Sequence, residues 1–261
     1  MQEFFQVALS DPLYNALVWL VDVLPGHSVG LAIIVLTIVV KLILSPFYYK
    51  SIKSQIEQQK IKPEIDKLKE KYPDKKEQAE KMMELYKEHG MSPLSGCLPI
   101  VLMLVIQLPI LLALYRIFLG GFSFDDADRL YSFVKTPEII RTAFLGLELT
   151  ISSIWVALLA GASQFIQIYF SPTMNAPKKE GEKEGTGTGA MMQNMMQKQM
   201  KFVLPVMIFF FAWKLPAALG IYWITTNFYT IIQEILIRNR VARKNKSKQP
   251  HTPSLASKSS D

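Results

Sequence analysis

Long apolar blocks are the feature that most constrains the fold of this chain. A helix needs ~20 mostly apolar residues to cross a bilayer, and four or five stretches approach that length in a chain of 261 residues that is 50% hydrophobic. These blocks exclude a soluble globular fold, and they leave little chain for a separate catalytic domain. The sequence therefore predicts an all-α polytopic membrane protein.

The apolar blocks predict five transmembrane helices joined by polar segments. The apolar run near the N-terminus is short and is interrupted by Asn15 and Asp22, so residues 1–28 are expected to form an external segment with an interfacial helix. The predicted spans are residues 29–50, 93–118, 143–170, 202–213 and 216–237. Between and after them we expect a cytosolic helical hairpin (51–92), an external loop (119–142), a flexible cytosolic loop (171–201) and a basic cytosolic tail (238–261).

The hairpin segment, residues 51–92, differs from the spans in its charge. It holds ten lysines and nine acidic residues, with a thin apolar stripe at helical spacing. The run Tyr72, Pro73, Asp74 breaks this stripe, Asp74 is suited to cap a second helix, and Gly90 is suited to end it. The segment is thus expected to be a pair of solvated helices.

The distribution of Lys and Arg predicts the topology. Assigning the polar segments to alternate sides places 23 of these residues on one side and 4 on the other. Since Lys and Arg accumulate on the cytoplasmic side, the N-terminus is expected outside and the C-terminus inside, which requires an odd number of spans.

Lys41 is the strongest functional signal in the sequence. It lies about eight residues before the inner end of the first span, or ~12 Å from the boundary. A lysine at the centre of a bilayer costs roughly 2.5–3.5 kcal/mol, so such residues usually face a protein interior or water and mark function. The alternative is that the side chain reaches up to the headgroups, which this depth makes difficult.

Other polar side chains lie in the remaining spans at helical spacing. Such a stripe either bonds helices to one another or lines a wet cavity, and Lys41 has no acidic residue at matching depth, so we expect water around it. Glu148 and Glu234 lie near the ends of the third and fifth spans and are expected to be solvated. The predicted groove residues are Lys41, Gln107, Gln164, Gln167, Tyr222, Trp223, Thr226 and Asn227.

The sequence lacks the motifs of the common catalytic and metal sites. It has no phosphate-binding P-loop, no HExxH zinc motif and no Cys/His cluster. Cys97 is the single cysteine, and the three histidines fall outside the predicted spans. We therefore expect no enzymatic activity, no cofactor and no metal.

Three segments resemble those of the YidC-type membrane protein insertases of the Oxa superfamily. They are PAALGIYWITTN (216–227), MSPLSGCLPI (91–100) and QLPILLALY (107–115). The resemblance covers about residues 28–238. It implies a hydrophilic groove that is open to the cytoplasm and to lipid but closed outward, with a positive residue from the first span at its centre. In this family that residue is typically Arg, and the matching position here is Lys41; Gln167 and Trp223 match further polar positions.

The resemblance implies a membrane protein insertase and chaperone that works without nucleotide in the bacterial cell membrane. Its partners would be nascent membrane proteins and the lipid bilayer. The hairpin could receive the signal recognition machinery, the tail could contact the ribosome, and the protein could work beside a Sec translocon. The alternative is a small secondary transporter or channel, although the chain has no internal repeat of the kind that transporters usually carry.

Overall fold

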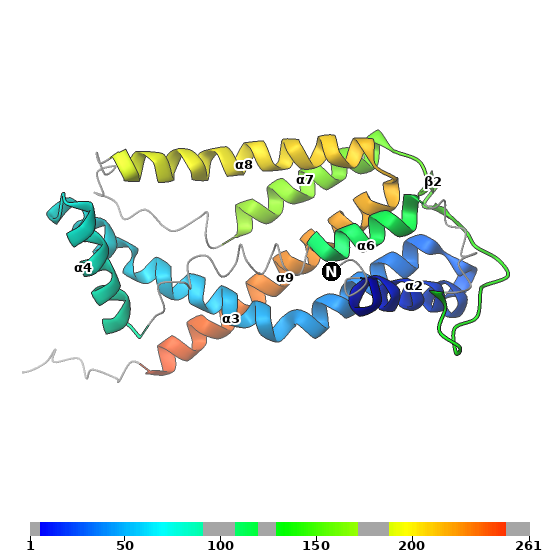
Figure 1. Cartoon of the computed structure of the whole chain (residues 1–261), viewed down its shortest axis with the longest axis horizontal. Coiled ribbons are helices and arrows are strands. Elements are labelled where there is room, and N and C mark those ends of the chain that lie inside the picture. The colour runs from blue at the N-terminus through cyan, green and yellow to red at the C-terminus, as the bar shows by residue number, and fades with distance from the viewer. Residues whose placement is uncertain (1–5, 91–107, 120–128, 172–187, 249–261) are drawn as a thin grey trace, which may run out of the picture.

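The computed structural model describes residues 6–90, 108–119, 129–171 and 188–248, and this part of the chain is mostly helical (Figure 1). A π-helical turn, η1 (Gln6–Ser10), and a 3₁₀ turn, η2 (Pro25–His27), flank the first helix. The helices are α2 (Asp11–Val23), α3 (Val29–Lys71), α4 (Lys75–Glu88), α6 (Leu108–Leu119), α7 (Ile154–Phe170), α8 (Thr188–Lys214) and α9 (Ala217–Lys248). The strands β1 (Ala143–Phe144) and β2 (Leu147–Glu148) form an antiparallel hairpin.

The first predicted span and the first arm of the hairpin form one continuous helix, α3. The Ser28 hydroxyl accepts a hydrogen bond from the Leu31 amide at 3.4 Å and so caps its N-terminus. At 1.5 Å per residue the helix is about 65 Å long, which exceeds a bilayer's hydrocarbon thickness. Among the described residues, its Val29–Ile61 part is long and apolar enough to cross a membrane, and Ile154–Phe170 is a shorter apolar helix.

The second arm of the hairpin, α4, begins and ends where the sequence indicates. Tyr72 is the last residue before the break, and the Asp74 carboxylate accepts a hydrogen bond from the Lys76 amide at 3.3 Å. After Glu88 the backbone turns through Gly90, whose φ of +64° suits glycine. Helix α4 packs against α3 at the end of the molecule opposite to α2 (Figure 1).

Helix α2 is anchored by the polar residues that interrupt its apolar run. Asn15 is buried; its amide donates to the Arg129 carbonyl at 2.9 Å, and its oxygen accepts from the Tyr131 amide at 2.7 Å. The Arg129 guanidinium in turn bonds the Asp11 carboxylate at 2.8 and 3.0 Å and the Ser10 hydroxyl at 3.2 Å. We call Ser10, Asp11, Asn15 and Arg129 the outer cluster. It fastens the segment that follows residue 128 onto α2.

The structure corrects the start of the third predicted span. Residues 143–148 form the β hairpin, and helix α7 begins only at Ile154. Both turn residues, Leu145 and Gly146, have positive φ angles of +51° and +78°, which is the geometry of a tight two-residue turn that matches the twist of the strands. Apolar composition alone did not reveal this turn.

The structure also corrects the extent of the predicted flexible loop. Helix α8 begins at Thr188, whereas the predicted span begins at residue 202 and the predicted loop runs to residue 201. The intervening segment is rich in Met, Gln and Lys, which have high helix propensity and extend the helix without being apolar throughout. Residues 172–187 of the predicted loop lie outside the described residues.

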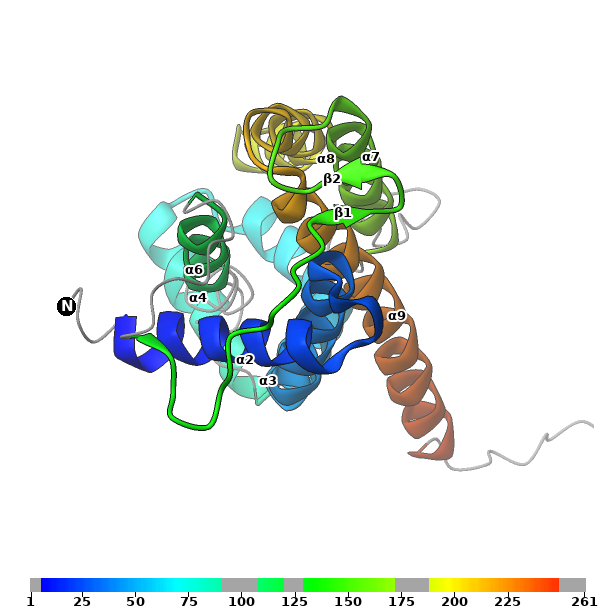
Figure 2. The ribbon, with the colours of Figure 1, turned by 90° about the vertical axis from the view of Figure 1, so that its right-hand side faces the viewer.

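Helix α7 lies between α8 and α9, and α9 also packs against α3. At Gly220 of α9 an added Cβ would collide with the Val156 side chain of α7, so glycine permits this close approach. Figure 2 looks along the long axis onto the end that carries α2 and the β hairpin. The packing of these helices buries polar side chains on the faces of α3, α7 and α9 that point into the molecule.

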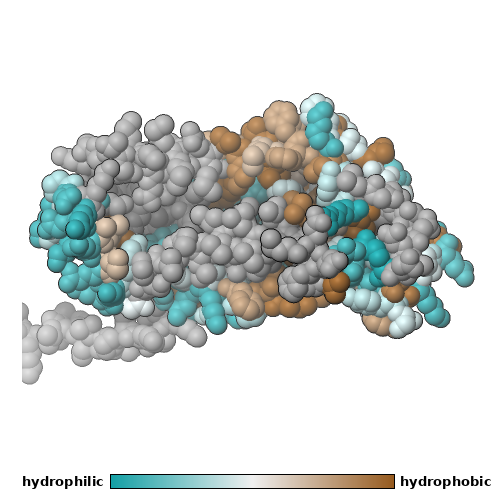
Figure 3. Space-filling model, viewed as in Figure 1, coloured by the Kyte–Doolittle hydropathy of each residue, from teal (hydrophilic) through white to brown (hydrophobic). Residues whose placement is uncertain are grey.

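Apolar side chains remain exposed on the outer faces of the helices. Figure 3 shows brown surface along the upper and lower edges of the molecule, over α8 and α3, and teal surface over α4. Exposed residues on α8 and α3 include Phe202, Val206, Phe210, Leu42 and Ile43. An exposed apolar surface of this extent is typical of a surface that contacts membrane or another apolar partner.

Candidate functional site

The Lys41 amine is buried between helices. The residue is 4% exposed, and its Nζ donates a hydrogen bond to the Tyr48 hydroxyl at 3.1 Å and lies 4.8 Å from the centre of the Tyr48 ring. Tyr48 follows Lys41 by seven residues, so both side chains lie on the same face of α3. The cation is therefore stabilised by a phenol from its own helix as well as by the ring's negative face.

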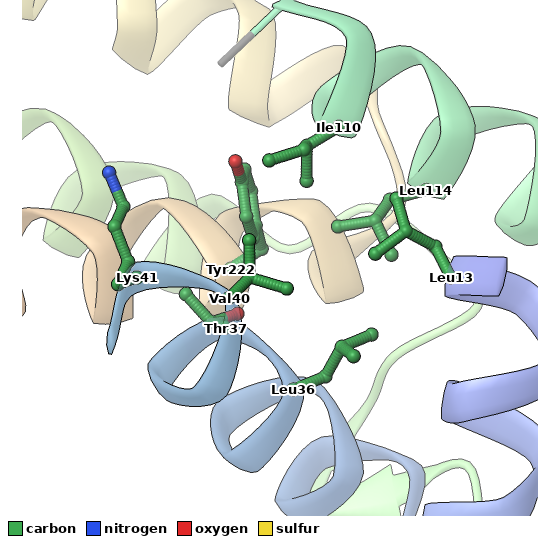
Figure 4. A pocket seen from close by; sticks show the side chains of 8 residues that line it. All are labelled: Leu13, Leu36, Thr37, Val40, Lys41, Ile110, Leu114 and Tyr222. Atoms are coloured by element: carbon green, nitrogen blue, oxygen red, sulfur yellow. The ribbon is translucent and has the colours of Figure 1, made fainter. Parts of the chain in front are cut away.

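A small cavity borders Lys41, as Figure 4 shows. Its volume of about 10 Å³ is room for one water at most. In the close-up the Lys41 amine and the Tyr222 hydroxyl extend to the same side, while Leu36 and Leu114 lie toward the other. The lining consists of Leu13 from α2, Leu36, Thr37, Val40 and Lys41 from α3, Ile110 and Leu114 from α6, and Tyr222 from α9.

This cavity is smaller and more apolar than the predicted groove. Within the described ranges, the pocket at Lys41 brings together two of the predicted groove residues, Lys41 and Tyr222. Gln107, predicted from the second span, lies outside the described residues. The hydrophilic groove therefore stays a prediction at this point.

A second set of predicted residues joins α7 to α9. The Trp223 indole donates to the side-chain oxygen Oε1 of Gln164 at 3.0 Å, and the side-chain nitrogen Nε2 of Gln164 donates to Oε1 of Gln167 at 3.2 Å. The Asn227 amide donates to the Ser163 hydroxyl at 2.9 Å. These side chains satisfy one another across the helix interface, which matches the interpretation of the polar stripe as a bond between helices.

The predicted groove residues on α9 thus have different neighbours. Tyr222 borders the Lys41 cavity, whereas Trp223 and Asn227 bond to α7. Thr226 is buried, and its hydroxyl oxygen has no hydrogen-bond partner in the described part of the chain. Trp223 and Asn227, four residues apart, thus face α7 together, and only the fold assigns them this partner.

Further polar residues, not predicted as groove residues, lie beyond Lys41 on α3 and beyond Asn227 on α9. The Gln233 amide donates to the Ser45 hydroxyl at 3.1 Å and so joins α9 to α3. Glu234, which was expected to be solvated, is only 6% exposed because α9 turns it toward α7, where the Gln167 amide donates to its carboxylate. Its seven-residue spacing from Asn227 was the available signal. We call Lys41, Tyr48, Gln167 and Glu234 the inner cluster.

The described residues contain no group of three or more His, Cys, Asp and Glu side chains that could hold a metal ion. The chemistry that this site offers is instead electrostatic and hydrogen-bonding. A buried cation, a phenol and amides can hold and orient polar or charged groups of another chain.

These features define a class of protein, a helical membrane protein whose polar side chains face inward and whose outer surface is apolar. The sequence model of the family described as the 60Kd inner membrane protein matches residues 19–245, and the chain belongs to this family. The resemblance identified from its three sequence segments is thereby confirmed.

Several relatives carry names that state an insertase function. The chain is 33% identical over 214 residues to the membrane protein insertase YidC of Fusobacterium nucleatum, which covers 82% of this chain and 87% of that protein. It is 33% identical over 250 residues to the membrane protein insertase MisCB of Bacillus subtilis, covering 90% of this chain and 80% of that protein. It is also 35% identical to YidC of Pelobacter propionicus over 215 residues. That alignment covers 81% of this chain and 35% of the longer Pelobacter protein.

Proposed function

We propose that this chain inserts integral membrane proteins and helps them fold, through an inward-open polar groove centred on Lys41 and without hydrolysing nucleotide. Family membership and the names of the relatives support the insertase class and favour it over the alternative of a transporter or channel. The observation that supports the groove is the burial of the Lys41 side chain between helices, because a lysine at this depth is costly and usually marks a functional site.

In this mechanism the groove shortens the apolar barrier for the substrate. A polar outer segment must otherwise cross ~30 Å of hydrocarbon. Lys41 attracts acidic residues of this segment, and Tyr48 holds the amine in place through its hydroxyl. The Lys41 cavity must widen to admit the segment, which requires α6 to move its Ile110 and Leu114 side chains away from α3.

Release of the substrate is driven by its own apolar helix. Transfer of that helix from a wet groove into lipid gains about 25 cal/mol per Å² of apolar surface. The exposed apolar faces of α7 and α9 form the slide along which it moves. They include Trp155, Leu158 and Phe165 on α7 and Phe228 and Ile232 on α9.

We assign the five membrane-spanning helices to α3, α6, α7, α8 and α9, with the N-terminus outside and the C-terminus in the cytoplasm. The lysine-rich and acidic arms of the α3–α4 hairpin then lie in the cytoplasm. Their exposed charges suit a docking role for the signal recognition machinery, and the basic tail suits contact with ribosomal RNA, whose phosphates attract Lys and Arg. Action beside a Sec translocon is compatible with this arrangement.

The test is insertion by the purified chain in liposomes that contain no nucleotide. A single-span substrate with a short polar outer segment is added, and insertion is measured as the fraction of that segment protected from external protease. Protein-containing liposomes are expected to protect the segment, and protein-free liposomes of the same lipid are the control. Equal protection in both contradicts the proposal, whereas flux of a small solute without insertion would support the transporter alternative.

A further inference from the structure

Glu234 is a buried carboxylate whose charge is not neutralised by an ion pair in the described part of the chain. The residue is 6% exposed, and one carboxylate oxygen, Oε2, has no hydrogen-bond partner. The ion pairs of the described residues are Lys53 with Glu57, Lys81 with Glu84, His89 with Glu64, and Arg129 with Asp11. A buried carboxyl in this condition either takes up a proton or gains from the arrival of a cationic partner.

The cation that acts on Glu234 from the same helix forms no ion pair with it among the described residues. Arg238 lies one turn further along α9 and attracts the carboxylate, but its Nη1 donates to the Phe170 carbonyl at the end of α7, at 3.3 Å. The Glu234 carboxylate accepts a hydrogen bond from the side-chain amide of Gln167, which is a neutral donor. Two further buried oxygens on the same stretch of α9, Thr226 Oγ1 and Gln233 Oε1, also have no partner within the described ranges. This stretch therefore offers acceptors without matching donors.

Lys41 and Glu234 lie at different depths along the helices. Lys41 bonds Tyr48, and Glu234 is close enough to Tyr48 to act on its hydroxyl electrostatically. Tyr48 lies seven residues beyond Lys41 on α3, roughly 10 Å nearer the inner end of that helix at 1.5 Å per residue. The positive group is thus the deeper one and the negative group lies toward the cytoplasm.

We propose that Glu234 is a specificity-determining residue that binds the Lys or Arg residues flanking a substrate's apolar segment on its cytoplasmic side. This inference rests on the proposed function. Membrane proteins carry these basic residues at the inner ends of their spans. A substrate whose basic flank pairs with Glu234 while its polar outer segment reaches Lys41 is held in the orientation in which it must be inserted. The two charges together select one orientation of the substrate.

The test is a double-mutant cycle between the insertase and its substrate, in the nucleotide-free liposome assay. One substrate carries three lysines after its apolar segment, and a matched substrate carries three glutamines. The full chain is compared with Glu234→Gln, with Glu234→Asp as the conservative variant and with Glu84→Gln as a control on the exposed face of α4. The ratio of the two insertion rates is measured within each protein, so a general loss of folded protein cancels.

We expect Glu234→Gln to lower the lysine-to-glutamine rate ratio about tenfold, and Glu234→Asp and Glu84→Gln to leave most of it intact. Glu234→Lys is expected to invert the preference, in favour of a substrate with an acidic inner flank. An unchanged ratio in Glu234→Gln, with both substrates still inserted, overturns this inference and leaves the proposed function standing; it would mean that the carboxyl is neutral or only structural. Failure of the unsubstituted protein to insert either substrate overturns the proposed function, and the inference falls with it.

Discussion

The outer cluster half-buries its charged side chains and the inner cluster buries Lys41 and Glu234, and the two clusters differ in how these charges are paired. In the outer cluster Arg129 and Asp11 form an ion pair at 2.8 Å, and the Asn15 amide group bonds backbone on both of its sides. In the inner cluster Lys41 and Glu234 belong to different helices and no ion pair joins them; Lys41 donates to the Tyr48 hydroxyl, on which Glu234 acts electrostatically.

We therefore expect the outer cluster to stabilise the fold and the inner cluster to bind the substrate. Removing one partner of a paired charge leaves the other uncompensated and destabilises the contact. A buried acid that has no ion pair among the described residues contributes less to stability, and it can receive a third group that carries the opposite charge. The following predictions test this division, in order of decreasing effect.

Removal of the Lys41 charge is expected to have the largest effect, and on activity. Lys41→Leu should slow insertion of substrates with acidic outer segments about a hundredfold, or about 2.7 kcal/mol, because a desolvated charge pair is lost. Lys41→Arg should retain most of the activity, since the positive charge remains. The initial rate of protease protection measures both. Equal rates for the two variants would remove Lys41 from the mechanism.

Removal of the outer ion pair is expected to affect stability first. Arg129→Ala should lower the free energy of unfolding by about 2 kcal/mol, because the half-buried Asp11 carboxylate loses its partner. Unfolding in mixed micelles by a denaturing detergent measures this loss, with Lys135→Ala, an exposed residue that follows on the same segment, as the control. A change in substrate preference without a loss of stability would contradict the division between the clusters.

The bond between α7 and α9 is expected to contribute less. Asn227→Ala should lower the free energy of unfolding by about 1 kcal/mol, the usual net value of one hydrogen bond, because Ser163 loses its contact with α9. Thr225→Val is the matched control, since the Thr225 hydroxyl bonds the Ile221 carbonyl of its own helix. Combining Asn227→Ala with Ser163→Ala should cost little more than either change alone, and full additivity would mean that the two side chains do not interact.

The smallest effect is expected at Glu148 on the β hairpin. Hydrogen bonds from the Thr142 and Thr150 hydroxyls lower the pKa of Glu148 from its ordinary value of 4.5. A lowered carboxyl pKa stabilises the fold above the ordinary value, and this contribution is lost as the pH falls through the lowered one. Thr150→Val should raise the pKa of Glu148, measured by NMR titration of the carboxyl carbon, while an unchanged pKa would show that the Thr150 hydroxyl does not act on it.

Local features of the sequence predicted much of the secondary structure. The break at Tyr72 and Pro73, the cap at Asp74 and the turn at Gly90 are found as expected, because each depends on residues adjacent in the chain. The β hairpin at residues 143–148 was missed, since its Leu-Gly turn lies in a run that reads as the start of an apolar helix. The N-terminal part of α8 was missed because helix propensity, rather than hydrophobicity, extends it.

The candidate site was predicted as a set of residues but not as a set of contacts. Lys41 and Tyr222 were found and do border one cavity, whereas Gln164, Trp223 and Asn227 bond within the α7–α9 interface. Glu234 was expected to be solvated because it lies near the end of a span, and Tyr48 was not among the predicted groove residues. The burial of Glu234 depends on which helix faces meet there, and a single helix carries no information about that.

The sequence by itself determined that this chain is helical, membrane-bound and a relative of the insertases, because the length of its apolar blocks, its Lys41 and its short motifs are properties of consecutive residues. Only the tertiary structure decided that the Lys41 amine bonds Tyr48, that Trp223 and Asn227 face α7, and that Glu234 is buried. The physical reason is that hydrophobicity acts on each segment separately, while the partner of a buried polar group is fixed by the packing of distant helices.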